Sequence, residues 1–220
     1  ILMQADFEAA ATLNKFQIVG TFGRSDIEAP KETMEFFTSH RHYLLYRPKD
    51  EWSIRAGRFF PAFGLNPPDH IIATRRGLGW DQGGETYNVE AAYIGEKFDG
   101  FLTGILGRPD KPEYHREKGL AVRGSRSFKE SYKVGGSYYY GSNDLGNRHL
   151  FGPYAIAGFT RHFFLLVEAD LVNTLSKTSP ATWGWANYAR LDYEIYRGIH
   201  VFLTEEINRQ NLKDSSTNTD

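Results

Sequence analysis

Apolar and polar side chains alternate along most of this chain with a period of two residues, which is typical of β-strands that present two different faces. In residues 163–173 the apolar face consists of Phe163, Leu165, Val167, Ala169 and Leu171, and the polar face carries Glu168 and Asp170. Comparable segments lie at residues 4–11, 16–22, 40–47, 52–60, 85–94, 98–106, 120–124, 132–140, 151–160, 163–173, 187–196 and 199–210. The pattern therefore predicts about twelve strands of roughly 8 to 11 residues, the length of tilted membrane-spanning strands.

The predicted connections alternate between short and long along the chain. Outer-membrane barrels show this asymmetry, because their periplasmic turns are tight and their external loops are longer. If the first short turn is periplasmic, the first strand descends from outside, so we expect an odd number of strands before it. The last strand runs outward into the polar stretch 211–220, so we expect an odd number after it as well.

The prediction is an all-β fold, an antiparallel up-and-down transmembrane β-barrel. About 12 strands belong to this chain, as part of a barrel of about 14 to 16 strands. Residues 1–220 are expected to form a single β-barrel domain, with additional strands before and after.

Composition agrees with this fold and excludes several other classes. The 220 residues are 24% charged, 40% hydrophobic and 15% aromatic, with 22 glycines and no cysteine, so a disulfide framework and a thiolate metal site are excluded. The longest apolar run, residues 163–167, is far too short for a spanning helix. Mean hydropathy of -0.50 is compatible with barrel strands that alternate between lipid and lumen. A net charge of -1 argues against nucleic-acid binding.

Residues 61–84 form the longest connection between predicted strands, and we expect this loop to fold into the pore as a constriction. Its paired bases Arg75 and Arg76 are offset by Asp69 and Asp81, which predicts a constriction of mixed charge. In the preceding strand, Arg55 and Arg58 fall on opposite faces. A bulge at Ala56-Gly57 would turn both inward; the alternative is that one of them extends to the membrane interface.

Charged side chains on the predicted lumen face have an uneven distribution. The bases Arg41, Arg47, Arg55, Arg58, Arg123 and Lys133 lie on early and middle strands, whereas Glu168, Asp170, Asp192, Glu194 and Glu206 lie on late ones, beside Arg190. Opposed rows would create a transverse field that filters solutes by charge and dipole. The alternative is that the groups pair with each other and fill the interior. The predicted pore-lining and constriction residues are Arg41, Arg55, Arg58, Asp69, Arg75, Arg76, Asp81, Lys133, Glu168, Asp170, Arg190, Asp192 and Glu194.

Enzymatic and metal-binding functions have weaker support. His40 and His42 would share one strand face and could ligate a metal, but a position at the membrane interface is favoured. A membrane lipase needs a serine beside a histidine on the lipid face, and the sequence does not place Ser39 or Ser53 in such a pair. The glycines of residues 77–84 follow no strand-to-helix signal, so a phosphate-binding loop is not indicated. We therefore expect no enzymatic activity and no cofactor.

Residues 55–65, RAGRFFPAFGL, resemble the strand-and-loop motif of phosphate-selective porin O/P-like outer-membrane proteins, with Gly57-Arg58, Phe59, Pro61 and Phe63-Gly64 as the matching positions. The resemblance implies a channel, commonly trimeric, whose inward-folded loop bears the selectivity residues. The lysine-rich loop that anion selectivity would require is missing here, so an anion preference does not follow.

The sequence thus predicts a porin-like channel, integral to the outer membrane of a Gram-negative envelope, for passive diffusion of small polar or charged solutes. The expected partners are lipid and lipopolysaccharide of the outer membrane, small polar solutes, and a homo-trimer or envelope complex, with no nucleic acid. One alternative is a non-conducting structural, adhesion or scaffold barrel. A third possibility is a soluble all-β ligand-binding protein, which would stay folded without detergent.

Overall fold

A computed structural model of the chain describes residues 4–25, 37–65, 72–80, 83–112 and 115–213. Most of these residues belong to one antiparallel sheet. Its strands are β1 (Gln4–Leu13), β2 (Phe16–Ser25), β3 (Phe37–Thr38), β4 (His42–Lys49), β5 (Trp52–Phe59), β6 (Thr86–Ile94), β7 (Phe98–Gly107), β8 (Lys118–Phe128), β9 (Tyr132–Asn143), β10 (Gly146–Gly158), β11 (Phe163–Ser176), β12 (Thr182–Tyr196) and β13 (Ile199–Arg209). No helix in the described ranges is long and apolar enough to cross a membrane.

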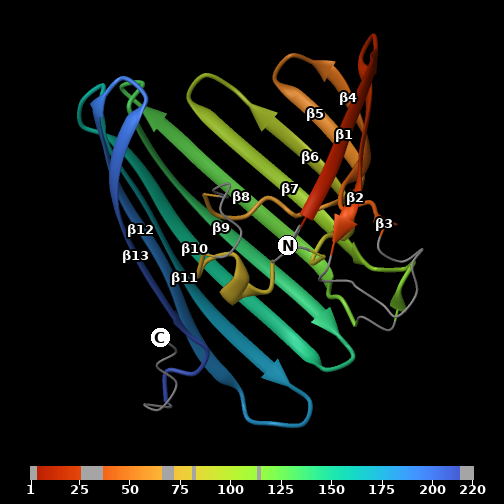
Figure 1. Cartoon of the computed structure of the whole chain (residues 1–220). Coiled ribbons are helices and arrows are strands. Elements are labelled where there is room, and N and C mark those ends of the chain that lie inside the picture. The colour runs from red at the N-terminus through yellow and green to blue at the C-terminus, as the bar shows by residue number, and fades with distance from the viewer. Residues whose placement is uncertain (1–3, 26–36, 66–71, 81–82, 113–114, 214–220) are drawn as a thin grey trace.

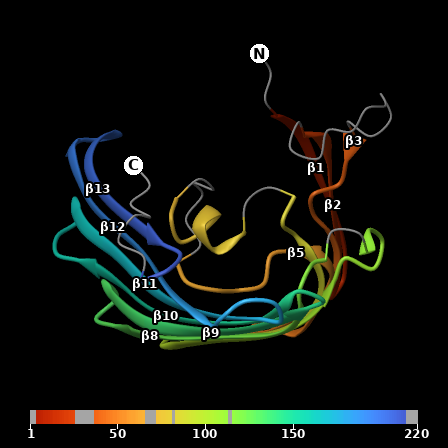
Figure 2. The ribbon, with the colours of Figure 1, turned by 90° about the horizontal axis from the view of Figure 1, so that it is seen from below.

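Each strand pairs with its neighbours in the sequence, so the topology is up-and-down (Figure 1). The order runs from β1 to β13, with the two-residue β3 paired only to β2 at one side of this path. The twelve strands of the path confirm the predicted count and the antiparallel up-and-down fold. Figure 2 shows that the sheet curves into a trough, with β1 and β13 as its two edge strands and the segment around the 3-10 helix η2 (Arg76–Leu78) on the concave side.

The two faces of the trough differ in polarity as the alternation predicted. On the convex face large apolar side chains are open to the surroundings, for example Leu203, which is 71% exposed. On the concave face polar side chains are buried, for example Thr103 and Asp170, both 0% exposed. This distribution, with apolar side chains outside and polar side chains inside, is the reverse of that in a soluble domain and is typical of a membrane barrel.

Aromatic side chains form a row on the convex face near the short turns. Trp52 lies 5.2 Å from Tyr93, and Phe163 lies 6.2 Å from Tyr193, measured between ring centroids. The row continues on other strands with Phe16, Tyr46, Phe98, Phe128 and Tyr132. Such girdles mark the level where the hydrocarbon core of a membrane meets the headgroups.

Two predicted connections are wrong. Strand β8 continues to Phe128, so residues 125–128 belong to a strand and the turn contains only residues 129–131. Strands β9 and β10 are joined by Asp144 and Leu145 alone, which breaks the short-long alternation at this point. The side-chain oxygen of Asn143 accepts hydrogen bonds from the backbone N–H groups of Leu145 (2.9 Å) and Gly146 (3.2 Å), and these bonds close the turn.

The predicted bulge at Ala56-Gly57 is also wrong. Strand β5 pairs with β4 and β6 in unbroken register through this region, so Arg55 points to the concave face and Arg58 to the convex one. Gly57 instead has a φ of 146°, and a Cβ at this position would lie 2.2 Å from the carbonyl oxygen of His42. The glycine therefore permits close approach of β4 and β5 without an inserted residue.

Candidate constriction site

The described residues of the long connection between β5 and β6, 60–65 and 72–80, lie on the concave face, and three of their main-chain N–H groups bind to the wall. The N–H of Gly64 donates to Ser137 Oγ on β9 (2.9 Å), and the N–H of Leu65 donates to Glu168 Oε2 on β11 (3.0 Å). Further along, the N–H of Ala73 donates to Glu206 Oε2 on β13 (3.0 Å). The loop is thus attached to strands about 70 to 130 residues away in the sequence.

Gly64 allows the first of these attachments. Its φ is 56°, in the left-handed region that side chains disfavour, and a Cβ there would lie 1.6 Å from Glu168 Oε1. The carboxylate of Glu168 consequently packs directly against the loop backbone. Any residue larger than glycine would push the loop away from β11.

Arg75 is the charged centre of the loop. Only 6% of it is exposed, and its guanidinium lies 5.3 Å from the Phe60 ring centroid and 5.6 Å from the Trp80 ring centroid. Burial lowers the pKa of Arg75, and the negative charges of Glu168 and Asp170 oppose that lowering. The loop therefore brings a cation to the two acids of β11, which are 3% and 0% exposed.

An aromatic cluster continues the contact toward β9. Phe63 and Trp80 lie 4.6 Å apart, and Trp80 meets Tyr139 edge-on at 5.5 Å. Beside them Arg148 donates to the Leu78 carbonyl (2.7 Å), from the loop's own short helix. Apolar contact, hydrogen bonds and charge thus all act on the same segment.

Most other charges of the concave face form pairs between strands or along one strand. The distances are 3.0 Å for Arg41 with Glu8, 2.7 Å for Arg55 with Glu90, 2.6 Å for Lys133 with Asp99, 2.7 Å for Arg148 with Glu117, and 2.8 Å for Arg190 with Asp192. Glu8, Glu90 and Asp99 lie among the early and middle bases, so the hypothesis of opposed rows of charge is wrong. The alternative of local pairing describes these groups.

The candidate residues divide by position. Arg41, Arg55, Lys133, Glu168, Asp170, Arg190, Asp192 and Glu194 belong to the concave side of the sheet, and Arg75 comes to this side with the loop. Arg76 is exposed in η2. Asp69 and Asp81 lie outside the described residues. A role of these residues in lining a pore stays a prediction.

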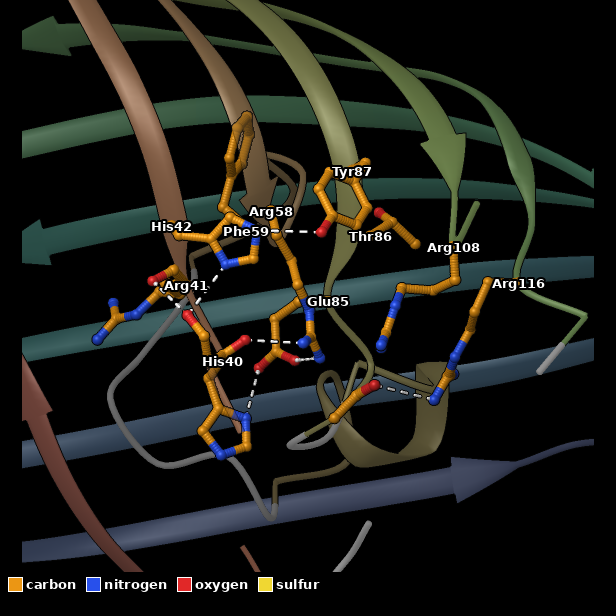
Figure 3. A network of polar contacts seen from close by, with 12 residues as sticks. His40, Arg41, His42, Arg58, Phe59, Glu85, Thr86, Tyr87, Arg108 and Arg116 are labelled. Carbon is orange, nitrogen blue, oxygen red and sulfur yellow. Dashed lines mark hydrogen bonds and ion pairs between the residues drawn. The ribbon is translucent and has the colours of Figure 1, made fainter. Parts of the chain in front are cut away.

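Arg58 belongs to a different group of residues, at the long-loop end of β4–β6 (Figure 3), and by its register it points to the convex side. Its guanidinium donates to the Ser39 carbonyl (2.7 Å) and to Glu85 (3.2 Å), and it is 3% exposed. Its pairing partners on the convex face are His42 and Tyr87, which are joined by a contact of 3.1 Å between His42 Nε2 and the Tyr87 hydroxyl. Arg58 therefore stabilises this corner of the sheet and does not face the concave side.

The same corner contains the serine-histidine contact that the sequence could not place. Ser39 Oγ lies 3.0 Å from His42 Nδ1, but the other ring nitrogen of His42 contacts the Tyr87 hydroxyl and not a carboxylate. His40 precedes β4 and contacts Glu85 at 3.7 Å, so the two histidines are not a pair on one strand face. In the described part of the chain no group of three metal-ligating side chains occurs. The absence of enzymatic activity stays an expectation.

Sequence reasoning missed Ser137, Tyr139 and Arg148 as contacts of the loop, and Glu117 as the partner of Arg148 and Tyr139. Their strand phase could have been found, because Ser137 and Tyr139 alternate with the convex residues Tyr138 and Tyr140. The contacts themselves depend on the curvature of the sheet, which the alternation does not encode.

No family model matches the chain, and no curated protein is similar to it at the level required for a match. Among solved structures, the chain is similar to OmpTdeltaL8, a loop L8 deletion mutant of the outer membrane protein OmpT of Vibrio cholerae, with 11% identity over 94% of this chain and 86% of that chain and a TM-score of 0.53. OmpT of the same organism, described as a trimer form, gives 10% identity, 93% and 80% coverage and a TM-score of 0.53.

The outer membrane channel DcaP of Acinetobacter baumannii gives 11% identity, 92% coverage of this chain, 65% of that chain and a TM-score of 0.59. These similarities, together with the twelve-strand path, show the fold of an outer-membrane β-barrel. They do not confirm the resemblance to the phosphate-selective porin O/P-like family.

Proposed function

We propose that this protein is a porin-like channel of the outer membrane for passive diffusion of small polar or charged solutes, with residues 61–84 as its constriction. The observation that carries the proposal is the attachment of this loop to the concave faces of β9, β11 and β13. A loop held inside a barrel narrows the passage through it, whereas a separate plug domain would close that passage.

The surroundings of the loop support a polar passage. A cavity of about 370 Å³ lies beside it, lined by Trp80, Arg116, Tyr139 and Arg148 among other residues, so polar and aromatic groups face the same space. Because most concave charges are paired locally, we expect weak discrimination between cations and anions. The aromatic row of the convex face supports integral placement in the outer membrane.

Planar-bilayer recording of the full-length protein tests the proposal. We expect discrete conductance steps and a reversal potential near zero in a salt gradient. Arg75→Met should change the single-channel conductance because it loosens the loop, whereas Arg126→Met, on the convex face between Phe98 and Phe128, should not.

A folded, inserted protein without conductance would refute the channel and favour the non-conducting structural, adhesion or scaffold barrel. Assembly into trimers, as in the trimer form described for Vibrio cholerae OmpT, is proposed together with the channel. Cross-linking in native membranes would show it as a species of three chains.

A further inference from the structure

A basic pocket lies at the end of the sheet where the long loops are, next to the constriction loop, which it meets through the contact of Arg116 with Gly83. It has a volume of about 460 Å³ and is lined by Arg108, Pro109, Pro112, His115, Arg116, Lys118, Ser142, Asn143, Asp144 and Lys177. We call it the rim pocket. Four of its residues carry permanent positive charge at neutral pH, and one carries a carboxylate.

Local partners offset part of this charge. Asp110 forms two hydrogen bonds with Arg108, of 2.9 and 3.0 Å, and Asp144 lies 3.4 Å from His115. Partial burial acts to raise the pKa of Asp110, but the hydrogen bonds and charge of Arg108 outweigh it and hold the pKa below its ordinary value. Asp110 therefore remains ionised and compensates Arg108.

Arg116, Lys118 and Lys177 remain as the positive side of the rim pocket. Arg116 donates to the carbonyl of Gly83 (3.2 Å), a neutral acceptor that leaves its charge in place (Figure 3). Within the described ranges neither lysine forms an ion pair with a carboxylate. Among the described residues, the four bases are thus opposed by Asp110 and Asp144, which leaves a surplus of about two positive charges at neutral pH.

The rim pocket is continuous with the apolar convex surface. Lys118 is the first residue of β8, Ser142 is the last residue but one of β9, and both point to the convex side. Lys177 directly follows β11. Two residues further into each strand, on the same face, lie Leu120, Tyr140 and Leu175. Each strand therefore places a polar group at the rim and an apolar group directly below it.

This order, with polar side chains at the rim and apolar side chains below them, matches the order of headgroup and acyl chains in a membrane lipid. Phosphate oxygens would meet the lysines, Arg116 and the Ser142 hydroxyl, while acyl chains would cover the apolar strip. A single phosphodiester carries one negative charge, so a surplus of about two positive charges fits a headgroup with more than one phosphate better. The long loops of such barrels are external, which places the pocket in the outer leaflet.

We propose that the rim pocket binds the phosphorylated headgroup of an outer-leaflet glycolipid of the lipopolysaccharide type. The inference depends on the outer-membrane placement proposed above, but not on conduction.

The opposite rim provides a control of similar size. A hollow of about 490 Å³ near the short turns is lined by Glu96, Lys97, Ser127, Lys129 and Glu130, so its two bases are balanced by two acids. Binding that depends only on surface lysines would occur equally at both rims. Binding that depends on surplus charge over an apolar strip would occur at the rim pocket alone.

Native mass spectrometry of the full chain with added bisphosphorylated lipid A tests the proposal. We expect one tightly bound lipid per chain, and a loss of about 30-fold in affinity for Lys118→Gln/Lys177→Gln. Lys97→Gln/Lys129→Gln should bind within about twofold of the parent, and Lys118→Arg/Lys177→Arg should retain binding, because both keep the surplus charge.

Several outcomes would overturn the proposal. They are equal loss in both glutamine variants, undiminished binding of dephosphorylated lipid A, or binding of inorganic pyrophosphate as tight as that of the lipid, which would make the pocket a site for free anions. Heat-dependent gel mobility verifies that each variant is folded. Bilayer conductance of the same variants should be unchanged, so failure here is separate from failure of the channel.

Discussion

We predict that the position of the loop around Arg75 depends on the charge of this residue, and this dependence can be measured. Removing one partner of a directly paired buried ion pair costs about 3 to 5 kcal/mol. Arg75 faces Glu168 and Asp170 without a direct ion pair among the described residues, so we take the lower end, about 3 kcal/mol. We therefore expect Arg75→Met to raise the equilibrium population of the detached loop about 10²-fold.

A cysteine reporter suits this measurement because the chain contains no cysteine. Thr74 is 0% exposed, and its hydroxyl has no hydrogen-bond partner within the described part of the chain, so Thr74→Cys removes one methyl group and no hydrogen bond. The rate of alkylation of this cysteine in the folded, reconstituted protein reports loop opening. Arg75→Met should raise the rate about 10²-fold.

A neutral variant separates charge from packing. In Arg75→Met/Glu168→Gln/Asp170→Asn no uncompensated charge remains, and the amide oxygen introduced at position 168 can still accept the hydrogen bond of Leu65. Since neutral replacements of buried ionic groups are often tolerated, alkylation should return to within about tenfold of the parent rate. An unchanged rate in Arg75→Met, or equal rates in the single and triple variants, would refute the electrostatic account.

Two further predictions concern the wall. Val167→Lys, in the middle of the convex face of β11, should lower the free energy of unfolding in lipid by about 2 to 4 kcal/mol. Ala10→Lys, on the concave face of β1, should lower it much less. Equal effects of the two variants in urea titrations would contradict the assignment of faces. Gly57→Ala should destabilise the barrel by at least about 1 to 3 kcal/mol, because φ is positive at this position and the new Cβ would meet the His42 carbonyl. Gly136→Ala should not change the free energy of unfolding, because the space around Gly136 is open. Tryptophan fluorescence during unfolding measures both effects.

The sequence was sufficient for the fold because every strand of a barrel wall lies between the same two environments. The phase of β11 is set by lipid on one side and water or polar groups on the other, so Leu165 and Glu168 could be assigned to faces without knowledge of their neighbours. Turn length is decided differently. One side-chain oxygen, that of Asn143, reduced an expected loop to two residues, and such local bonds leave only a weak pattern.

The candidate site was predictable only in part. Glu168, Asp170 and Arg75 were identified individually, but their proximity links residues about 90 positions apart and follows from the curvature of the sheet. The expected row of bases was wrong since Glu90 and Asp99 occupy the same face, and pairing across adjacent strands depends on register. The alternation excludes a shift in register by one residue, because that would exchange the faces, but it does not exclude a shift by two residues, which changes the charges that become neighbours.

The attachment of the loop through the N–H groups of Leu65 and Ala73 does not depend on which side chains these two positions carry. Main-chain donors are common to all residues except proline, so the side chains at positions 65 and 73 can diverge among descendants of this protein while the loop keeps its path. The architecture is therefore suited to evolutionary change, and to engineering, of what passes through the barrel without redesign of the wall.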